Sequence, residues 1–426
     1  MTCPAEATLL LCAEKLDDSC LGHVDACAEC RATVTELERT IHELRAVAPP
    51  AEHRLLTLPP APSSRRLFFA AAAVILVVTG VGLYRAGTRP KDPVLSPAKP
   101  SPVPAPRDEG TEMAAKGLQW LAKTQKENGS FGSVGLTGLS LQAFFAAGHG
   151  ENSPDYGGAV RKGLGFLLTC QTQTGEFAGT ELKPIYDNAI AGWALIEAVD
   201  GKRSADPRVR QAAEKAVAFL VSAQNPGKGW RYSSKCGDND TSVTFWAASA
   251  LATARRAGLK VPDEALAGAK AWVQAATDPE TLAVGYNAPR TGKVYVPGVN
   301  ETYQHHASMS AAGMALRLLA GDARDAAMVS AVGFLATDPP SAATVEQQDF
   351  YYWHLGTIAL FLNVGAESPL WQDWNARLLK ALKVSQQDDG SWTPNDRWAK
   401  IEEAGPVYAT AINALTLETA RRFGRR

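Results

Sequence analysis

The sequence lacks an excess of charge of either sign. Its 43 lysines and arginines nearly balance 44 aspartates and glutamates, so the formal net charge is −1. A protein that holds nucleic acid needs positive charge to neutralise phosphates, and no such field surrounds this chain as a whole. We therefore expect no nucleic-acid partner.

Cysteine is nearly absent after residue 30. Five of the seven cysteines lie in the first 30 residues, and only Cys170 and Cys236 follow them. This distribution excludes a disulfide framework for a large extracellular domain. It favours a local metal site near the N-terminus.

Composition divides the chain into five zones. Residues 1–48 are short, cysteine-rich and helical in pattern, and residues 49–66 contain five prolines that prevent a continuous helix. Residues 67–84 are apolar, and residues 85–110 form a stiff spacer with seven prolines. Residues 111–426 show helical periodicity, which predicts one large helical domain.

The apolar zone 67–84, "LFFAAAAVILVVTGVGLY", has eighteen residues without a charge, between Arg66 and Arg85. This length fits the lower end of the range for a transmembrane helix, and the segment lies too far from the N-terminus for an ordinary cleaved signal peptide. A buried core helix is the alternative. Basic residues are nearly balanced on its two sides, so they do not fix its orientation.

The stretch "HVDACAEC" spaces His23, Cys27 and Cys30 as His-x3-Cys-x2-Cys. One helical turn followed by a tight Cys-x2-Cys clasp supplies three zinc ligands, and a closed site needs a fourth. The stretch resembles the zinc-binding domain of bacterial anti-sigma factors. That resemblance implies a ligand well upstream of the histidine, which we assign to Cys3, with Cys20 as the alternative. Chance clustering of cysteines is the competing interpretation.

The next segment, "RATVTELERTIHELRAV" at residues 31–47, carries one apolar stripe. The same resemblance implies that such a helix helps to clasp a sigma factor. Packing within its own small domain, or a short dimeric coiled coil, are the alternatives. Because reduced thiols persist as zinc ligands more readily in the cytosol, we expect residues 1–48 to be cytoplasmic.

A short pattern recurs after residue 110: Gln, three residues, Gly, one residue, aromatic. The copies are Gln125/Gly129/Phe131, Gln171/Gly175/Phe177 and Gln386/Gly390/Trp392, with a copy shifted by one at Gln224/Gly229/Trp230. Each ends an apolar-striped helix at a glycine turn, and a helix rich in small residues follows. With weaker copies near Ala269 and Ser330 there are six helix pairs, which favours a closed α/α barrel over an open solenoid.

These repeats resemble those of the terpenoid cyclase and protein prenyltransferase superfamily, over about residues 112–426. The resemblance implies an all-α fold, an α6/α6 toroid with an outer and an inner ring of helices. It also implies that the turn glutamines are structural, so we assign them to stability rather than to chemistry.

In such a toroid the N-terminal ends of the inner helices surround one mouth of the barrel. The candidate ligand-binding residues there are Tyr186, Asp187, Asp238, Asp240, Trp246, His305, His306, Asp349, Tyr352, His354 and Tyr408. Aromatic side chains with a few acids suit a glycan or a lipid. The alternative is that several of these side chains belong to the core.

Catalytic motifs of the superfamily are incomplete in this sequence. Cyclases that protonate an alkene carry Asp-x-Asp-Asp with the middle aspartate as proton donor, and the matching register here places Asn239 at that position, between Asp238 and Asp240. Prenyltransferases bind zinc through Asp-x-Cys and a later histidine, where this chain has Ser242 and Tyr352. A serine hydroxyl is a poor zinc ligand.

The acids are better explained as helix caps than as catalysts. Asp187, Asp240 and Asp349 each come just before or at the start of an inner-helix segment, where a carboxylate accepts backbone N–H bonds. We expect Asp240 to accept from Val243 or Thr244. We therefore predict no catalytic residue.

Together these patterns predict a single-pass protein of a bacterial inner membrane. A cytoplasmic domain with one Zn²⁺ is joined to an extracytoplasmic toroid. Two functions remain open: a transmembrane regulator that binds a ligand outside and a sigma factor or other protein inside, or a membrane-anchored enzyme acting on an isoprenoid, lipid or glycan.

Overall fold

The computed structural model describes residues 27–28, 31–32, 35, 108–178, 184–291, 307–341, 348–394, 396 and 405–424. The predicted linker, the predicted transmembrane segment and residues 85–107 of the predicted spacer lie outside these residues, as does most of the predicted zinc-binding domain. The last spacer residues, 108–110, are the cap and the start of the first helix of the toroid. The described part contains thirteen helices, α5 to α17, and no strand beyond isolated bridges, which confirms the predicted all-α fold there. None of the described helices is both long and apolar enough to cross a membrane.

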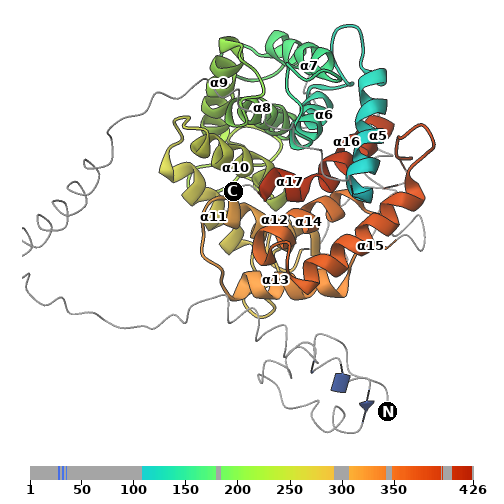
Figure 1. Ribbon diagram of the computed structural model, residues 1–426. Coiled ribbons are helices and arrows are strands. Elements are labelled where there is room, and N and C mark those ends of the chain that lie inside the picture. Colours follow the sequence, from blue (N-terminus) through green and yellow to red (C-terminus); the bar gives the residue numbers. More distant parts are fainter. Residues whose placement is uncertain are drawn as a thin grey trace, which may run out of the picture. The chain divides into compact units, whose positions relative to one another are not determined.

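The helices alternate between an outer and an inner ring (Figure 1). The outer helices are α5 (Glu109–Thr124), α7 (Gly157–Cys170), α9 (Pro207–Ala223), α11 (Asp263–Ala275), α13 (Ala326–Thr337) and α15 (Pro369–Ser385). The inner helices are α6 (Val134–Ala146), α8 (Pro184–Asp200), α10 (Thr241–Arg256), α12 (Ala307–Leu319), α14 (Phe350–Val364) and α16 (Gly405–Leu417). A short helix, α17 (Thr419–Phe423), follows.

Burial separates the two rings. Every residue of α6 is buried, and α10 and α14 are buried over nearly their whole lengths. The outer helix α5 instead buries one stripe that includes Met113, Leu118 and Leu121. A helix that is apolar or small on all sides needs neighbours on all sides, whereas an amphipathic helix covers a core with one face.

The inner ring is closed. Each inner helix packs against the next, and α16 packs against both α6 and α5, at the start of the domain. The sequence pattern favoured a closed barrel over an open solenoid, and these contacts confirm the closed toroid.

The turn glutamines connect neighbouring repeats, as predicted. Each side-chain amide donates to a backbone oxygen of the next outer helix: Gln125 to Ala159 at 2.9 Å, Gln171 to Ala212 at 2.9 Å, Gln224 to Ala265 at 2.8 Å and Gln386 to Met113 at 2.9 Å. The following aromatic side chains, Phe131, Phe177, Trp230 and Trp392, are buried. The repeated turn therefore specifies contacts between neighbouring helix pairs of the ring.

The turn glycines leave room for the neighbouring helix. Gly129 has φ +88°, and a Cβ there would lie 2.2 Å from the backbone oxygen of Lys162; Gly175 is in the same position against Lys215. In the third repeat, where the turn is one residue longer, Gly268 stands at the outer-helix position that Lys162 and Lys215 occupy in the other repeats. A Cβ on Gly268 would lie 2.8 Å from the Lys228 oxygen. In this repeat the residue that must be glycine therefore lies in the outer helix, whereas in the other two it lies in the turn.

Helix α17 covers the mouth at which the inner helices end (Figure 1). Arg421 of α17 donates to the backbone oxygen of Ala147, at the C-terminal end of α6, at 2.5 Å. Arg422 reaches into the barrel and pairs with Glu197 of α8 at 2.7 Å. The mouth at which the inner helices begin lies at the other end.

Candidate functional site

The inner helices carry hydroxyl groups at one equivalent position in their first turn. In α8, α10, α12 and α16 this position lies two residues before a side chain that accepts a backbone N–H from the preceding turn. In α10 and α14 it lies two residues after the aspartate that caps the helix. The residues are Tyr186, Ser242, Ser308, Tyr351 and Tyr408, which we call the mouth layer, while α6 has Gly135. The prediction included Tyr186 and Tyr408; the register of the repeat would also have identified Ser242 and Ser308.

Part of the mouth layer forms a hydrogen-bonded network. The Ser242 and Tyr351 hydroxyls are 2.6 Å apart, and the Tyr186 hydroxyl lies 3.3 Å from Ser242. Trp246 donates its indole N–H to the Tyr186 hydroxyl at 3.1 Å. Since α10 and α14 are separated in the ring by α12, the Ser242–Tyr351 contact joins non-adjacent helices across the barrel. Burial raises the pKa of Tyr351 to about 12, so this network is neutral.

The side chains at this mouth differ in how deeply they are buried. Tyr186, Asp187 and Tyr408 are half-buried, whereas Ser242 and Tyr351 are buried. Tyr408 is close enough to Tyr186 to help raise the pKa of that phenol, although burial is the main cause. Among the described residues at the mouth, the partly exposed ones therefore include two phenol rings with their hydroxyls and the Asp187 carboxylate.

Asp187 does not cap its helix, and that prediction was wrong. Helix α8 begins at Pro184, so Asp187 lies inside the first turn. Proline is well suited to the first position of a helix, which explains the early start. The Asp187 carboxylate packs against α6 at Gly135, where an added Cβ would lie 2.2 Å from Oδ1.

Asp240 caps α10, as predicted. Its Oδ1 accepts the backbone N–H of Val243 at 2.7 Å, and the side chain is fully buried. An isolated bridge with Trp230 fixes its backbone. The Asp240 carboxylate therefore has a structural role in holding the first turn of the inner helix.

Burial affects the pKa of the Asp240 carboxyl more than the capping hydrogen bond does. Burial raises its pKa to about 7, while the Val243 N–H, the Tyr286 hydroxyl and the Arg231 guanidinium favour the charged form and lower it. Arg231 Nε lies 4.0 Å from Oδ2. A pKa near neutrality is also what a general acid requires, so geometry must decide between the two roles.

Asp238 and Asn239 occupy the sequence positions of the proton-donor motif, but neither is a buried acid. The Asp238 side chain is 73% exposed and pairs with Arg231 at 3.3 Å. Asn239 is buried and accepts from the Asn225 amide at 3.1 Å. Neither supplies an acid inside the barrel.

Asp349 and Tyr352 serve the start of α14. Asp349 accepts the Tyr352 backbone N–H at 2.9 Å, which confirms the predicted cap. The Tyr352 hydroxyl donates to the backbone oxygen of Asp338, at the end of the outer helix α13, at 2.7 Å. Tyr352 therefore contacts the outer ring, whereas its neighbour Tyr351 belongs to the mouth layer.

His354 and Trp246 lie in the interior of the barrel. Their rings are stacked, 5.9 Å between centroids with 13° between planes, and His354 Nδ1 is 2.9 Å from the Thr416 hydroxyl. Burial, helped by the positive charge of Arg422, lowers the pKa of His354 to about 3. The imidazole is thus neutral at physiological pH.

Several predicted site residues lie outside the described residues: His305 and His306 of the mouth, and Cys3, His23 and Cys30 of the zinc site. Cys27 is described and half-buried. Within the described ranges, no group of three histidine, cysteine, aspartate or glutamate side chains is placed to hold a metal ion.

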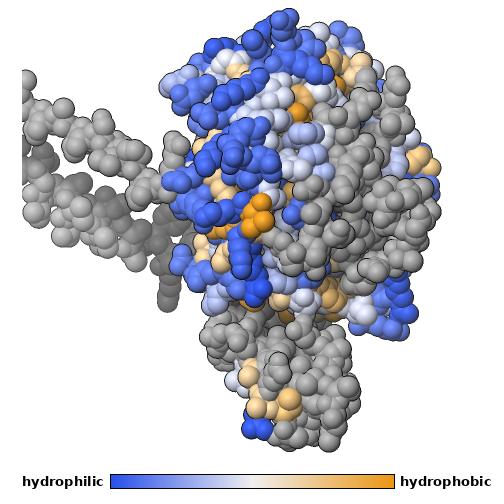
Figure 2. All heavy atoms as spheres, turned by 90° about the vertical axis from the view of Figure 1, so that its right-hand side faces the viewer, coloured by the Kyte–Doolittle hydropathy of each residue, from blue (hydrophilic) through white to orange (hydrophobic). Residues whose placement is uncertain are grey.

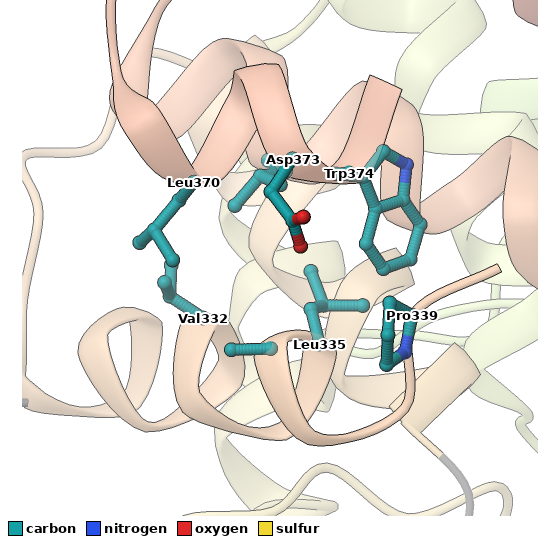
Figure 3. A pocket seen from close by; sticks show the side chains of 8 residues that line it. Val332, Leu335, Pro339, Leu370, Asp373 and Trp374 are labelled. Carbon is teal, nitrogen blue, oxygen red and sulfur yellow. The ribbon is translucent and has the colours of Figure 1, made fainter. Parts of the chain in front are cut away.

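A small hollow lies in the outer layer between α13 and α15 (Figure 3). It is lined by Val332, Leu335, Ala336, Pro339, Leu360, Leu370, Asp373 and Trp374 and holds about 60 Å³. Ligand pockets for drug-sized molecules are roughly 300 Å³ or more, so this hollow is too small for an oligosaccharide or an isoprenoid. The surface in Figure 2 is mainly hydrophilic where it is coloured, with only small apolar areas.

No protein-family model matches the sequence, and no curated protein matches it. Solved structures do. An α-1,6-mannanase, GH76A of Salegentibacter sp., bound to α-1,6-mannotriose, superimposes with a TM-score of 0.52 at 14% identity, over 74% of this chain and 99% of the mannanase.

A second similar structure is the type II terpene cyclase MstE from Scytonema. It has a TM-score of 0.51 at 14% identity, over 74% of this chain and 98% of the cyclase. Its complex with geranylgeranyl dihydroxybenzoate gives the same TM-score and identity. At this identity the likeness shows the fold alone, and it confirms the cyclase-like toroid.

Proposed function

We propose that this chain is a single-pass bacterial membrane protein whose extracytoplasmic toroid binds a neutral glycan at the mouth layer without transforming it. Its cytoplasmic zinc-binding domain would act on a sigma factor or another protein. The toroid is then the sensing part and the N-terminal domain the responding part.

The filled interior of the barrel carries the proposal for the toroid. Directly beneath the mouth layer, Trp246 is 1% exposed, and Trp193 and His354 are 0% exposed. Fully buried side chains leave no space for a substrate beside them. A cyclase or prenyltransferase has to enclose its substrate, so a ligand of this toroid would rest on the mouth.

The chemistry of the mouth layer favours a carbohydrate. The half-buried rings of Tyr186 and Tyr408 offer apolar faces for a sugar ring, and their hydroxyls and the Asp187 carboxylate offer hydrogen bonds to its hydroxyl groups. The five residues of the layer include no lysine or arginine. These five side chains therefore supply no cation for a diphosphate.

Titration calorimetry of the full-length protein tests this proposal. The ligands are neutral oligosaccharides, α-1,6-mannotriose among them, and geranylgeranyl diphosphate as the anionic comparison. We expect an oligosaccharide to bind, and Tyr408→Ala to weaken it by about tenfold, or ~1.4 kcal/mol. Tyr156→Ala, at the start of the outer helix α7, should leave affinity unchanged. Binding of the diphosphate alone would contradict the proposal.

An enzyme is the second candidate, because the pKa of Asp240, about 7, is suited to proton transfer. The geometry opposes it. The Asp240 side chain is 0% exposed, and one of its oxygens already holds the Val243 N–H. Only a product that depends on Asp240 would favour this candidate.

The zinc proposal rests on the donor set, since two cysteines, a histidine and a third cysteine suit tetrahedral Zn²⁺. A peptide of residues 1–48 should bind about one equivalent and gain helix, more weakly as pH falls, because ligation needs thiolates. Cys30→Ser should remove most of this gain, and Cys12→Ser should not. Capture of a sigma factor by the zinc-loaded peptide would support the proposed partner, and failure of every sigma factor of the source cell to bind would count against it.

A further inference from the structure

A stretch of eight residues recurs at the ends of two inner helices. It reads "LATARRAG" at residues 251–258 and "LETARRFG" at residues 417–424, with six identities. Each copy begins seven residues after the threonine that accepts a backbone N–H from the preceding turn, Thr244 in α10 and Thr410 in α16. The two copies therefore occupy the same position in the repeat.

The two copies fold differently. In α10 the stretch belongs to one uninterrupted helix that runs to Arg256, and Gly258 with φ +72° follows it. In the sixth repeat α16 ends at Leu417, Glu418 has φ −91° and ψ 9°, and α17 starts at Thr419. No glycine or proline lies at this break, and leucine, glutamate and alanine are good helix formers. The local sequence therefore does not account for the break.

Contacts with the barrel hold the broken form. The Arg422 side chain is 5% exposed, and its Nε and Nη2 lie 2.8 and 2.7 Å from Glu197 Oε1 of α8. Nη2 also donates to Gln142 Oε1 of α6 at 2.8 Å, and the guanidinium carbon lies 4.5 Å from the ring centroid of Trp193. The equivalent side chain in α10, Arg256, is 39% exposed. The same arginine is thus inside the barrel in one copy and at the surface in the other.

The broken form also leaves hydrogen bonds unmade. Among the described residues, Thr419 Oγ1, Arg422 Nη1 and Glu197 Oε2 are buried polar atoms without a partner. In α10 the equivalent threonine, Thr253, donates to the backbone oxygen of Ser249 one turn earlier, at 2.9 Å. An unbroken helix would offer Thr419 the same bond and would bring the guanidinium into water. The broken form therefore gains the ion pair and loses bonds that the unbroken form makes, and burying an ion pair is itself costly.

We propose that residues 405–424 form a two-state latch over the mouth opposite the mouth layer. In the closed state, which the structure shows, the helix is broken at Glu418 and Arg422 lies against Glu197. In the open state residues 405–423 form one helix, as the matching residues do in α10, and Arg422 is in solvent. Opening uncovers the Glu197 carboxylate and the Trp193 ring at this mouth. A partner that binds one state better than the other would shift the latch.

Thiol labelling of the full-length protein measures how often the latch opens. Thr419→Cys places a thiol where the closed state is 1% exposed, and Ser249→Cys places one where the core of α10 is 0% exposed. Peptide mass spectrometry distinguishes these thiols from the native ones. We expect Thr419→Cys to react at least ~tenfold faster than Ser249→Cys, because opening exposes it without unfolding the barrel. Equal rates would overturn the proposal.

The ion pair and the break should each control this rate. In the Thr419→Cys background, Glu197→Gln should accelerate labelling, whereas Asp200→Asn, which removes the partner of the equivalent Arg256, should not. Glu418→Ala matches α10 at the break and should label about fivefold faster than Glu418→Gly, because glycine disfavours a continuous helix. Acceleration by neither Glu197→Gln nor Glu418→Ala would contradict the latch.

The labelled protein itself separates an open latch from a melted α17. A maleimide adduct on Thr419→Cys does not fit the closed state and holds the latch open. A structure of this adduct should show residues 405–423 as one helix with Arg422 exposed. If α17 opened by melting, the adduct would show an irregular segment after residue 417, and glycine at 418 would label as fast as alanine or faster, since glycine gains the most freedom in an unfolded segment. Either result would overturn the proposal.

Discussion

The side-chain amide of Gln386 donates to the backbone oxygen of Met113 across 2.9 Å, although 273 residues separate them in the sequence. This bond joins the last outer helix to the first. The same amide also donates to Gly390 in its own turn at 3.0 Å. One glutamine thus stabilises a repeat turn and closes the toroid.

Replacing Gln386 should therefore weaken the domain. Gln386→Ala removes two hydrogen bonds and should lower the free energy of unfolding by about 1–3 kcal/mol. Gln372→Ala, at an exposed position of the same helix, should stay within ~0.5 kcal/mol of the wild type. Denaturant titration measures both. Equal stability of the two variants would show that the closing bond contributes nothing.

The shifted third repeat gives a second prediction. Gly268→Ala places a methyl group 2.8 Å from the Lys228 oxygen, so it should destabilise the toroid in spite of the better helix propensity of alanine. Gly165→Ala, on the outer helix α7 with nothing within 4 Å, should stabilise it by about 0.5–1 kcal/mol. Thermal unfolding of the pair should move in opposite directions; a gain in both variants would contradict the packing of this turn.

The fold was predictable from the sequence because its repeats are local. Each of the four turns that carry a glutamine, a glycine and an aromatic residue fixes one helix end and one contact with the next repeat, and six helix pairs close the ring. The caps at Asp240 and Asp349 are equally local, and both were predicted.

Other features depend on register between distant helices and were missed. The Ser242–Tyr351 contact joins two helices that are not neighbours in the ring. The insertion of Arg422 depends on where the chain leaves the last inner helix, and no repeat encodes it. Asp187 was misplaced because helix α8 starts at a proline, which usually signals a boundary but is accepted in the first turn.

The buried ion pair of Arg422 and Glu197 predicts a large effect of one substitution. Arg422→Ala leaves the Glu197 carboxylate buried without its cation and should cost about 3–5 kcal/mol. Arg210→Ala, whose ion pair with Glu214 on the outer helix α9 is exposed, should cost less than ~1 kcal/mol. The double variant Glu197→Gln/Arg422→Met should recover much of the loss. If Arg422→Ala unfolds at the wild-type temperature, α17 does not seal this mouth.

The raised pKa of Asp240 predicts how stability changes with pH. A carboxyl with a higher pKa in the folded state than in the unfolded state releases its proton on unfolding. Its contribution is therefore most favourable below the unfolded value of about 4. That contribution is lost as pH rises towards the folded pKa of about 7.

Asp240→Asn should remove this dependence, since asparagine caps a helix well but does not ionise. Relative to the wild type, the variant should be more stable at about pH 8, by roughly 2–4 kcal/mol, and nearly equal at about pH 4. A difference between Asp240→Asn and wild type that stays constant with pH would contradict the raised pKa.

The central claim, that the toroid binds without catalysis and that Asp240 caps rather than donates a proton, is tested most directly by product analysis. Purified protein is incubated with squalene, geranylgeranyl diphosphate and α-1,6-mannotriose, and the mixtures are examined by mass spectrometry and chromatography. The proposal predicts that every compound is recovered unchanged, with wild type and with Asp240→Asn alike. A cyclised, transferred or hydrolysed product that disappears in Asp240→Asn, while that variant remains folded, would contradict it.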